Sequence, residues 1–171
     1  MKTFTKLAAT VATVAAMATG AKAASITEIA VGDERFSTLV AAVTAAGLAD
    51  TLAGPGPFTV YAPVNDAFDA LPAGTVETLL KPENKGQLTD VLLYHVDDRK
   101  LTAEAIPAGS NYFKPLLTSQ RLCITKAGGG VSIADGTGDT ANVIIANIKA
   151  DNGVIHVIDK VLLPGQRPAC H

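Results

Sequence analysis

Between residues 26 and 101 the apolar residues recur at the three- and four-residue spacing of amphipathic helices. Asp33 is a suitable N-cap for the first helix, and Gly47 is a suitable stop. The apolar stripe of this helix consists of Phe36, Leu39, Val40 and Val43. A later stripe consists of Leu88, Val91, Leu92 and His95. The first half of the chain is therefore predicted to be mainly helical.

A short helix and one strand lie between these two stripes. Thr75 is expected to cap the helix, and Pro82 is expected to end it because proline cannot continue a helix. The Gly-Pro-Gly-Pro run at residues 54–57 leads into a predicted strand over residues 58–62.

After residue 112 the pattern changes to short β-branched and apolar runs, which predict strands over residues 121–126, 131–134, 142–149 and 154–158. Glycine-containing turns separate these runs, and the three glycines at 128–130 are expected to form a hairpin turn. The near-continuous apolar stretch of Ile144, Ile145 and Ile148 predicts sheet interior. Helices followed by strands indicate an α+β fold with the helices gathered on one side, and the strand at 58–62 is expected to join the C-terminal sheet.

The first 23 residues have the pattern of a cleaved export signal. Lys2 and Lys6 precede an Ala/Val-rich stretch that ends in Ala21-Lys22-Ala23. The stretch is too short and too rich in alanine for a membrane span. We therefore expect Sec export with cleavage after Ala23, a secreted or periplasmic location, and a single soluble domain over residues 24–171.

The charge balance excludes two classes of partner. The whole chain has 14 basic and 16 acidic residues, and its formal net charge is −2. Three of the lysines lie in the leader, so the mature chain is more acidic still. Nucleic acids and anionic membranes require basic patches, so neither is expected as a partner.

Cys123 and Cys170 are the two cysteines of the chain. In an exported protein a disulfide between them is the natural interpretation. Two free thiols or half of a metal site are the alternatives, although no Cys-x-x-Cys motif supports the metal site.

The residues Asn65, Asp66 and Phe68 follow the strand at 58–62 and are predicted to begin a helix. Asn65 can cap the first turn, Asp66 suits the helix dipole, and Phe68 can pack inward. A role of Asn65 or Asp66 in a ligand site is the alternative.

Two histidines could be structural or chemical. His95 lies at a helix C-terminus, where a cationic tip would be favourable. His156 shares a strand face with Val154 and Ile158, so we expect a buried, neutral, hydrogen-bonded side chain whose pKa is below about 6.5. A metal site completed by Asp97, Asp98 or Asp159 is the alternative, and it would allow a hydrolase. No Gly-x-Ser-x-Gly, His-Glu-x-x-His or P-loop motif occurs, and no cofactor is expected.

Three sequence boxes resemble one family. Residues 59–68 read Thr-Val-Tyr-Ala-Pro-Val-Asn-Asp-Ala-Phe, and residues 152–164 run from Asn152 and Gly153 through His156 to a proline. Tyr94-His95 lies between them. These boxes resemble the fasciclin (FAS1) domain, with Tyr61 and Val64 where the family has Phe and Thr.

The resemblance implies a β-sandwich wedge with helices packed along one edge. It also implies a non-catalytic adhesion module that contacts a cell-surface or matrix protein. The segment that would make this contact contains Tyr94, His95, Asp97, Asp98 and Arg99, with Asp97 and Asp98 in a charged run expected to be a solvated loop. A single soluble copy can bridge two surfaces only if it dimerises or binds at two faces. The alternative is a carrier or sensor that holds a small hydrophobic or polysaccharide ligand between helices and sheet.

Overall fold

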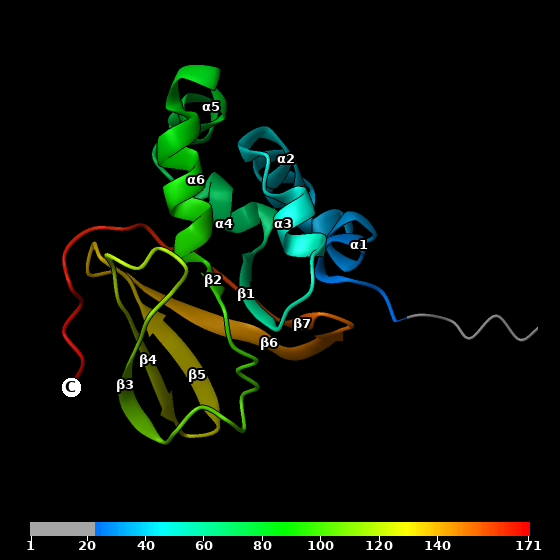
Figure 1. Ribbon diagram of the computed structural model, residues 1–171. Helices are drawn as coiled ribbons and strands as arrows, with labels where there is room; N and C mark the ends of the chain where they lie inside the picture. Colours follow the sequence, from blue (N-terminus) through cyan, green and yellow to red (C-terminus); the bar gives the residue numbers. More distant parts are fainter. Residues whose placement is uncertain (1–22) are drawn as a thin grey trace, which may run out of the picture.

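The computed structural model describes residues 23–171, with the helices at one end of the molecule and the strands at the other (Figure 1). The predicted leader lies outside this range except for Ala23, so its cleavage stays a prediction. The helices are α1 (Ile26–Val31), η1 (Glu34–Phe36), α2 (Ser37–Ala46), α3 (Ala49–Ala53), α4 (Asn65–Asp69), α5 (Thr75–Leu80), η2 (Pro82–Asn84) and α6 (Lys85–Tyr94). Within residues 23–171, no helix has the length and apolar character needed to span a membrane.

The strands are β1 (Phe58–Pro63), β2 (Val96–Asp97), β3 (Gly109–Phe113), β4 (Leu122–Ala127), β5 (Gly130–Ala134), β6 (Thr140–Ala150) and β7 (Gly153–Ile158). They form one seven-stranded sheet in the order β2-β1-β7-β6-β5-β4-β3. Strands β1 and β7 are parallel, and the other neighbours are antiparallel. The α+β class is confirmed, but one curled sheet takes the place of the expected sandwich. Strand β6 makes the curl possible because residues 140–142 pair with β5 and residues 143–150 pair with β7.

The alternation of side chains along the strands separates two cores. Val60 of β1 and Ile155 of β7 face the helices and pack against α1, α2 and α6. Tyr61 and Ile158 point to the opposite face and pack inside the curled sheet, together with Leu122 of β4. Strands β1 and β7 therefore lie between the helical layer and the rest of the sheet.

Strand β6 contradicts the prediction of sheet interior for part of its apolar run. Ile144 is 53% exposed and Ile145 is 38% exposed, while Ile148 packs against the helical core. The register of β6 against β7 shifts between Val143 and Ile145 and again between Ile145 and Ile148. Such bulges interrupt the regular alternation of side chains between the two faces of the sheet. The apolar pattern therefore could not show which isoleucines are buried.

The turn residues explain where several elements begin and end. Gly47 ends α2 in the left-handed conformation, with a φ of 73°, as predicted. Gly128 and Gly129 also have positive φ and form the β4–β5 hairpin turn that was predicted. The capping role predicted for Thr75 is wrong. Gly74 occupies the cap position, and α5 has no side-chain cap.

Candidate functional site

Asn65 ties two helices together instead of capping its own. Val64 holds the cap position of α4, so the predicted N-cap role of Asn65 is wrong. Asn65 Oδ1 accepts from Ser37 Oγ (3.2 Å) and from the amide of Thr38 (3.1 Å) at the start of α2. Its Nδ2 donates to the carbonyl of Glu34 at 2.8 Å. The amide thus satisfies donors at the beginning of a helix that is distant in sequence.

The rest of this first box builds the core beside Asn65. Phe68 is buried, and Asp66 lies exposed in the first turn of α4. Tyr61 is fully buried, and its ring stacks on that of His156 with centroids 5.9 Å apart. Among the described residues no group hydrogen bonds to the Tyr61 hydroxyl. Its pKa is raised because burial disfavours the phenolate.

Asn152 joins three segments at the beginning of β7. Its Oδ1 accepts from the amide of Ile26 at 3.0 Å, and its Nδ2 donates to the carbonyls of Leu52 (2.6 Å) and Gly54 (2.8 Å). The next residue is Gly153, where an added Cβ would overlap the carbonyl of the neighbouring strand β1. The second box therefore fixes α1 and α3 against the parallel strand pair.

His95 is neutral and links α6 to the segment after β7. The residue is 2% exposed, and Nδ1 lies 2.7 Å from the carbonyl of Val91, to which it donates. The amide of Leu162 donates to Nε2 at 2.8 Å. Burial lowers the pKa of His95 to about 4, against the weaker opposite effects of the Val91 carbonyl and the Asp135 carboxylate. The structural interpretation of His95 is therefore confirmed, and its ring is neutral instead of a cationic helix tip.

His156 uses the opposite tautomer. Its Nε2 donates to the carbonyl of Leu101 at 2.5 Å, and its Nδ1 accepts from the amide of Asn147 at 3.3 Å. Burial lowers the pKa of His156, while the Leu101 carbonyl and the Glu104 carboxylate act in the opposite direction. The predicted buried, neutral and hydrogen-bonded histidine is confirmed. Both ring nitrogens are engaged in these hydrogen bonds, so neither is available to bind a metal ion.

The segment expected to contact a partner is largely buried. Tyr94 is 0% exposed and Asp97 is 1% exposed, so neither can offer a side chain to another molecule. Asp97 belongs to β2, and its carboxylate accepts from the guanidinium of Arg99 at 2.8 Å and 2.6 Å. The solvated loop expected here is wrong at this residue. Asp98 and Arg99 are exposed, and with Lys114 they line a shallow surface notch.

One buried carboxylate, that of Asp135, was not singled out from the sequence. Asp135 Oδ1 accepts from the amides of Thr137 and Asp139, and its Oδ2 accepts from the amide of Leu163 at 2.9 Å. An Asp-Gly-Thr sequence is the available signal, because aspartate commonly bonds the backbone two residues on. No group of three His, Cys, Asp or Glu side chains within residues 23–171 forms a potential metal site.

The helical layer contains a partly open apolar cavity of about 140 Å³. It lies between α1, α2, α3 and the face of β1 and β7, and its walls are almost entirely hydrocarbon. Six residues that line it are Ile26, Phe36, Leu39, Val43, Val60 and Ile155. Ala30 and Ala49 also line it, and small side chains there leave space that larger ones would fill.

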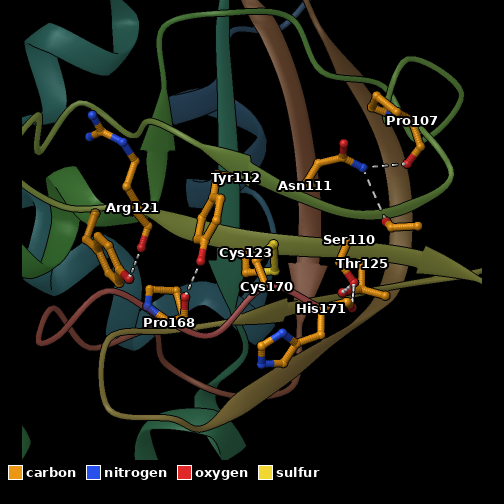
Figure 2. Close-up of a disulfide and its surroundings, with 12 residues drawn as sticks. Pro107, Ser110, Asn111, Tyr112, Arg121, Cys123, Thr125, Pro168, Cys170 and His171 are labelled. Atoms are coloured by element: carbon orange, nitrogen blue, oxygen red, sulfur yellow. Dashed lines mark hydrogen bonds between the residues drawn. A yellow bond between two sulfur atoms is a disulfide. The ribbon is translucent and has the colours of Figure 1, made fainter.

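The disulfide predicted from the two cysteines is present. Cys123 of β4 is bonded to Cys170, and their Cα atoms are 5.4 Å apart. Figure 2 shows the C-terminal segment crossing β4 at this point.

Polar side chains of the three boxes thus bond groups inside the protein and form a framework that holds the helices against a mixed sheet. Over residues 34–164 the chain matches the fasciclin domain family. The chain belongs to the fasciclin family. Protein sll1483 of Synechocystis sp. (strain ATCC 27184 / PCC 6803 / Kazusa) is 51% identical over 142 residues, which cover 83% of this chain and 74% of that protein.

Two further relatives extend this comparison. The transforming growth factor-beta-induced protein ig-h3 of Sus scrofa is 38% identical over 82% of this chain, which spans 19% of that protein. A solved FAS1 domain pair of the insect cell adhesion molecule fasciclin I has the same fold. The TM-score is 0.71 at 19% identity, and the match covers 84% of this chain and 52% of that one.

Proposed function

We propose that this fasciclin-family protein is an exported, non-catalytic module that contacts another protein at a cell surface or in a matrix. The observation that carries the proposal is the shared fold with a domain pair of a cell adhesion molecule. The proposal is also supported by the two histidines, whose ring nitrogens are directed to groups inside the protein. The ring nitrogens of His95 and His156 bond backbone groups, so neither histidine is paired with a nucleophile.

The contact surface is assigned to the exposed part of the Tyr94–Arg99 segment. Asp98 and Arg99 have side chains that are 70% and 50% exposed, and Lys114 is exposed beside them. The three side chains share one surface notch with Leu116. Charges of both signs around an apolar floor suit a protein surface better than a polyanion.

Binding to immobilised surface extract of the source cells tests this assignment. Charge reversal by Asp98→Lys or Lys114→Glu should weaken binding at least about tenfold, which corresponds to about 1.4 kcal/mol. The matched control is Lys81→Glu, which reverses an exposed lysine beside α5 and should leave binding unchanged. Equal binding by all variants would refute the assignment. Sedimentation of the exported chain would show whether it dimerises. A protein with a single binding site must dimerise in order to bridge two surfaces.

The apolar cavity favours a second function, the carriage of a small apolar ligand. Its volume of about 140 Å³ is close to that of an engineered 150 Å³ protein cavity that binds benzene. The walls offer almost no polar surface, which disfavours the polysaccharide form of this alternative.

Titration with benzene, followed by NMR, tests the carrier function. The methyl signals of Leu39 and Val43 should shift as the cavity fills. Ala30→Leu should abolish the shift because it fills the cavity, whereas Ala45→Leu adds the same side chain at an exposed position of α2 and should not. Unshifted wild-type methyl signals at saturating benzene would exclude the carrier function for this cavity.

A further inference from the structure

Residues 165–171 form a strap that crosses the face of β3 and β4 opposite the inner core (Figure 2). The amide of Gln166 donates to the carbonyl of Gly136 at 2.7 Å, and it is the last backbone-to-backbone bond toward the C-terminus in the described chain. Beyond it the strap lies against Tyr112. The hydroxyl of Tyr112 donates to the carbonyl of Pro168 at 2.9 Å, and the guanidinium of Arg167 lies 4.1 Å from the ring centroid.

Two further attachments hold the end of the strap. Ser110 Oγ donates to the carbonyl of His171, and Cys170 is bonded to Cys123. Cys123 is 2% exposed, whereas Cys170 is only half-buried. The disulfide therefore attaches the strap covalently to β4, and Cys170 is the more exposed of the two residues.

The strap contributes nothing to either described hydrophobic core. The residues of both cores extend no further toward the C-terminus than Leu163. Leu163 is fixed independently, because its amide donates to Asp135 and its carbonyl accepts from the amide of Gly136. Gly136 and Gly165 also pack backbone against backbone so closely that a Cβ on either would overlap the other. Release of the strap beyond this point would leave the core side chains in place.

We propose that Cys123–Cys170 is a thiol-exchange site and that the strap is a redox-released cover over β3 and β4. A dithiol reductant supplies the two electrons. Its thiolate attacks Cys170 Sγ, which forms a mixed disulfide and expels the Cys123 thiolate, and that thiolate takes a proton from water. The second thiol of the reductant then attacks the mixed disulfide. The products are the oxidised reductant and a protein with two thiols.

Release changes the surface that the protein presents. Tyr112 is already 42% exposed, and it would lose the stacked guanidinium and the Pro168 carbonyl. The thiol of Cys123 would become accessible beside β3, which is an edge strand of the sheet. An exposed thiol is a reactive group. The protein thus has one surface in an oxidising compartment and another in a reducing one.

Reduction of the full exported chain with dithiothreitol tests the proposal. Before reduction, thiol titration under denaturing conditions should find no free thiol. After reduction, the ¹⁵N order parameters of Arg167 and of residues 169–171 should fall below about 0.6, while those of the helices and strands stay near about 0.85. Iodoacetamide should then modify Cys123 in the folded protein. Cys170→Ser should reproduce the mobile strap without reductant.

A pair of tyrosine variants separates the strap from the fold. Tyr112→Phe removes the hydroxyl that bonds Pro168 and should speed reduction several-fold. Tyr94→Phe removes a hydroxyl that donates to the carbonyl of Arg121 at 2.8 Å, which is not part of the strap, and should not speed it. An ordered strap and an unreactive Cys123 after reduction would overturn the proposal. Unfolding of the helices and strands on reduction would also overturn it, because the disulfide would then be a staple of the fold.

Discussion

His95 connects burial to acid stability in a way that can be measured. Burial lowers its pKa from 6.5 in the unfolded chain to about 4 in the folded protein. Protonation would also direct an N–H at Nε2 toward the amide of Leu162, which now donates to that nitrogen. Because the folded pKa lies below the unfolded value, the stabilisation is complete above about pH 6.5 and is lost as the pH falls toward the folded pKa.

The two pKa values set the size of the effect. Each unit of pKa difference corresponds to about 1.4 kcal/mol, so His95 should lower the free energy of unfolding by about 2 kcal/mol between about pH 7 and pH 5. His156 acts in the same direction because its pKa is also lowered. Asp33 and Glu104 have carboxyl pKa values below their ordinary range, so they protonate mainly below this interval.

Urea unfolding of the wild type and His95→Gln at several pH values measures this contribution. Glutamine can still accept from Leu162 and donate to Val91, but it does not titrate. Between about pH 7 and pH 5 the wild type should lose about 2 kcal/mol more stability than the variant. Parallel curves for the two proteins would refute the argument, because they would show that His95 protonates in the folded state as easily as in the unfolded state.

Substitutions of Asn65, Asn152 and Tyr61 test the polar framework by urea unfolding at neutral pH. Asn65→Ala should cost about 1–2 kcal/mol because α2 loses its tertiary cap, whereas Asp66→Ala at the exposed neighbour should cost under about 0.5 kcal/mol. Asn152→Asp should be no more stable than Asn152→Ala, because a carboxylate cannot donate to the two carbonyls that the amide bonds. Tyr61→Phe should stabilise the protein by up to about 1 kcal/mol, because it removes a buried hydroxyl without a partner in the described chain. A loss of stability would show that this hydroxyl is bonded.

Periodicity predicted the elements whose packing is regular. Helix α6 presents Leu88, Val91 and Leu92 to the core at helical spacing, and all three are buried. The alternation in β7 likewise placed His156 in the interior. In both cases one face of the element meets a continuous partner, so the sequence pattern and the burial have the same period.

Tertiary contacts decided the features that the sequence could not reveal. Asn65 has the residue type and position of a local cap, yet its amide bonds groups near the start of α2. Asp97 is in a charged run, yet the Arg99 guanidinium allows its burial in β2. Strand β3 was missed because its sequence is mostly polar and it pairs only along one edge. In each case the feature depends on a contact with another segment or on the orientation of a nearby side chain. The local sequence pattern does not carry this information.

The residues that carry the family resemblance are poorly placed to contact a partner. His95 joins α6 to the segment after β7, and His156 joins β7 to the segment after β2, each through a backbone donor and a backbone acceptor. The side chain of Asn152 likewise bonds backbone groups of α1 and α3. Substitutions in this framework should alter binding only through stability. The contact surface that we propose instead uses side chains that the framework leaves outside, such as Asp98 and Lys114, where substitution should change binding while the free energy of unfolding does not change.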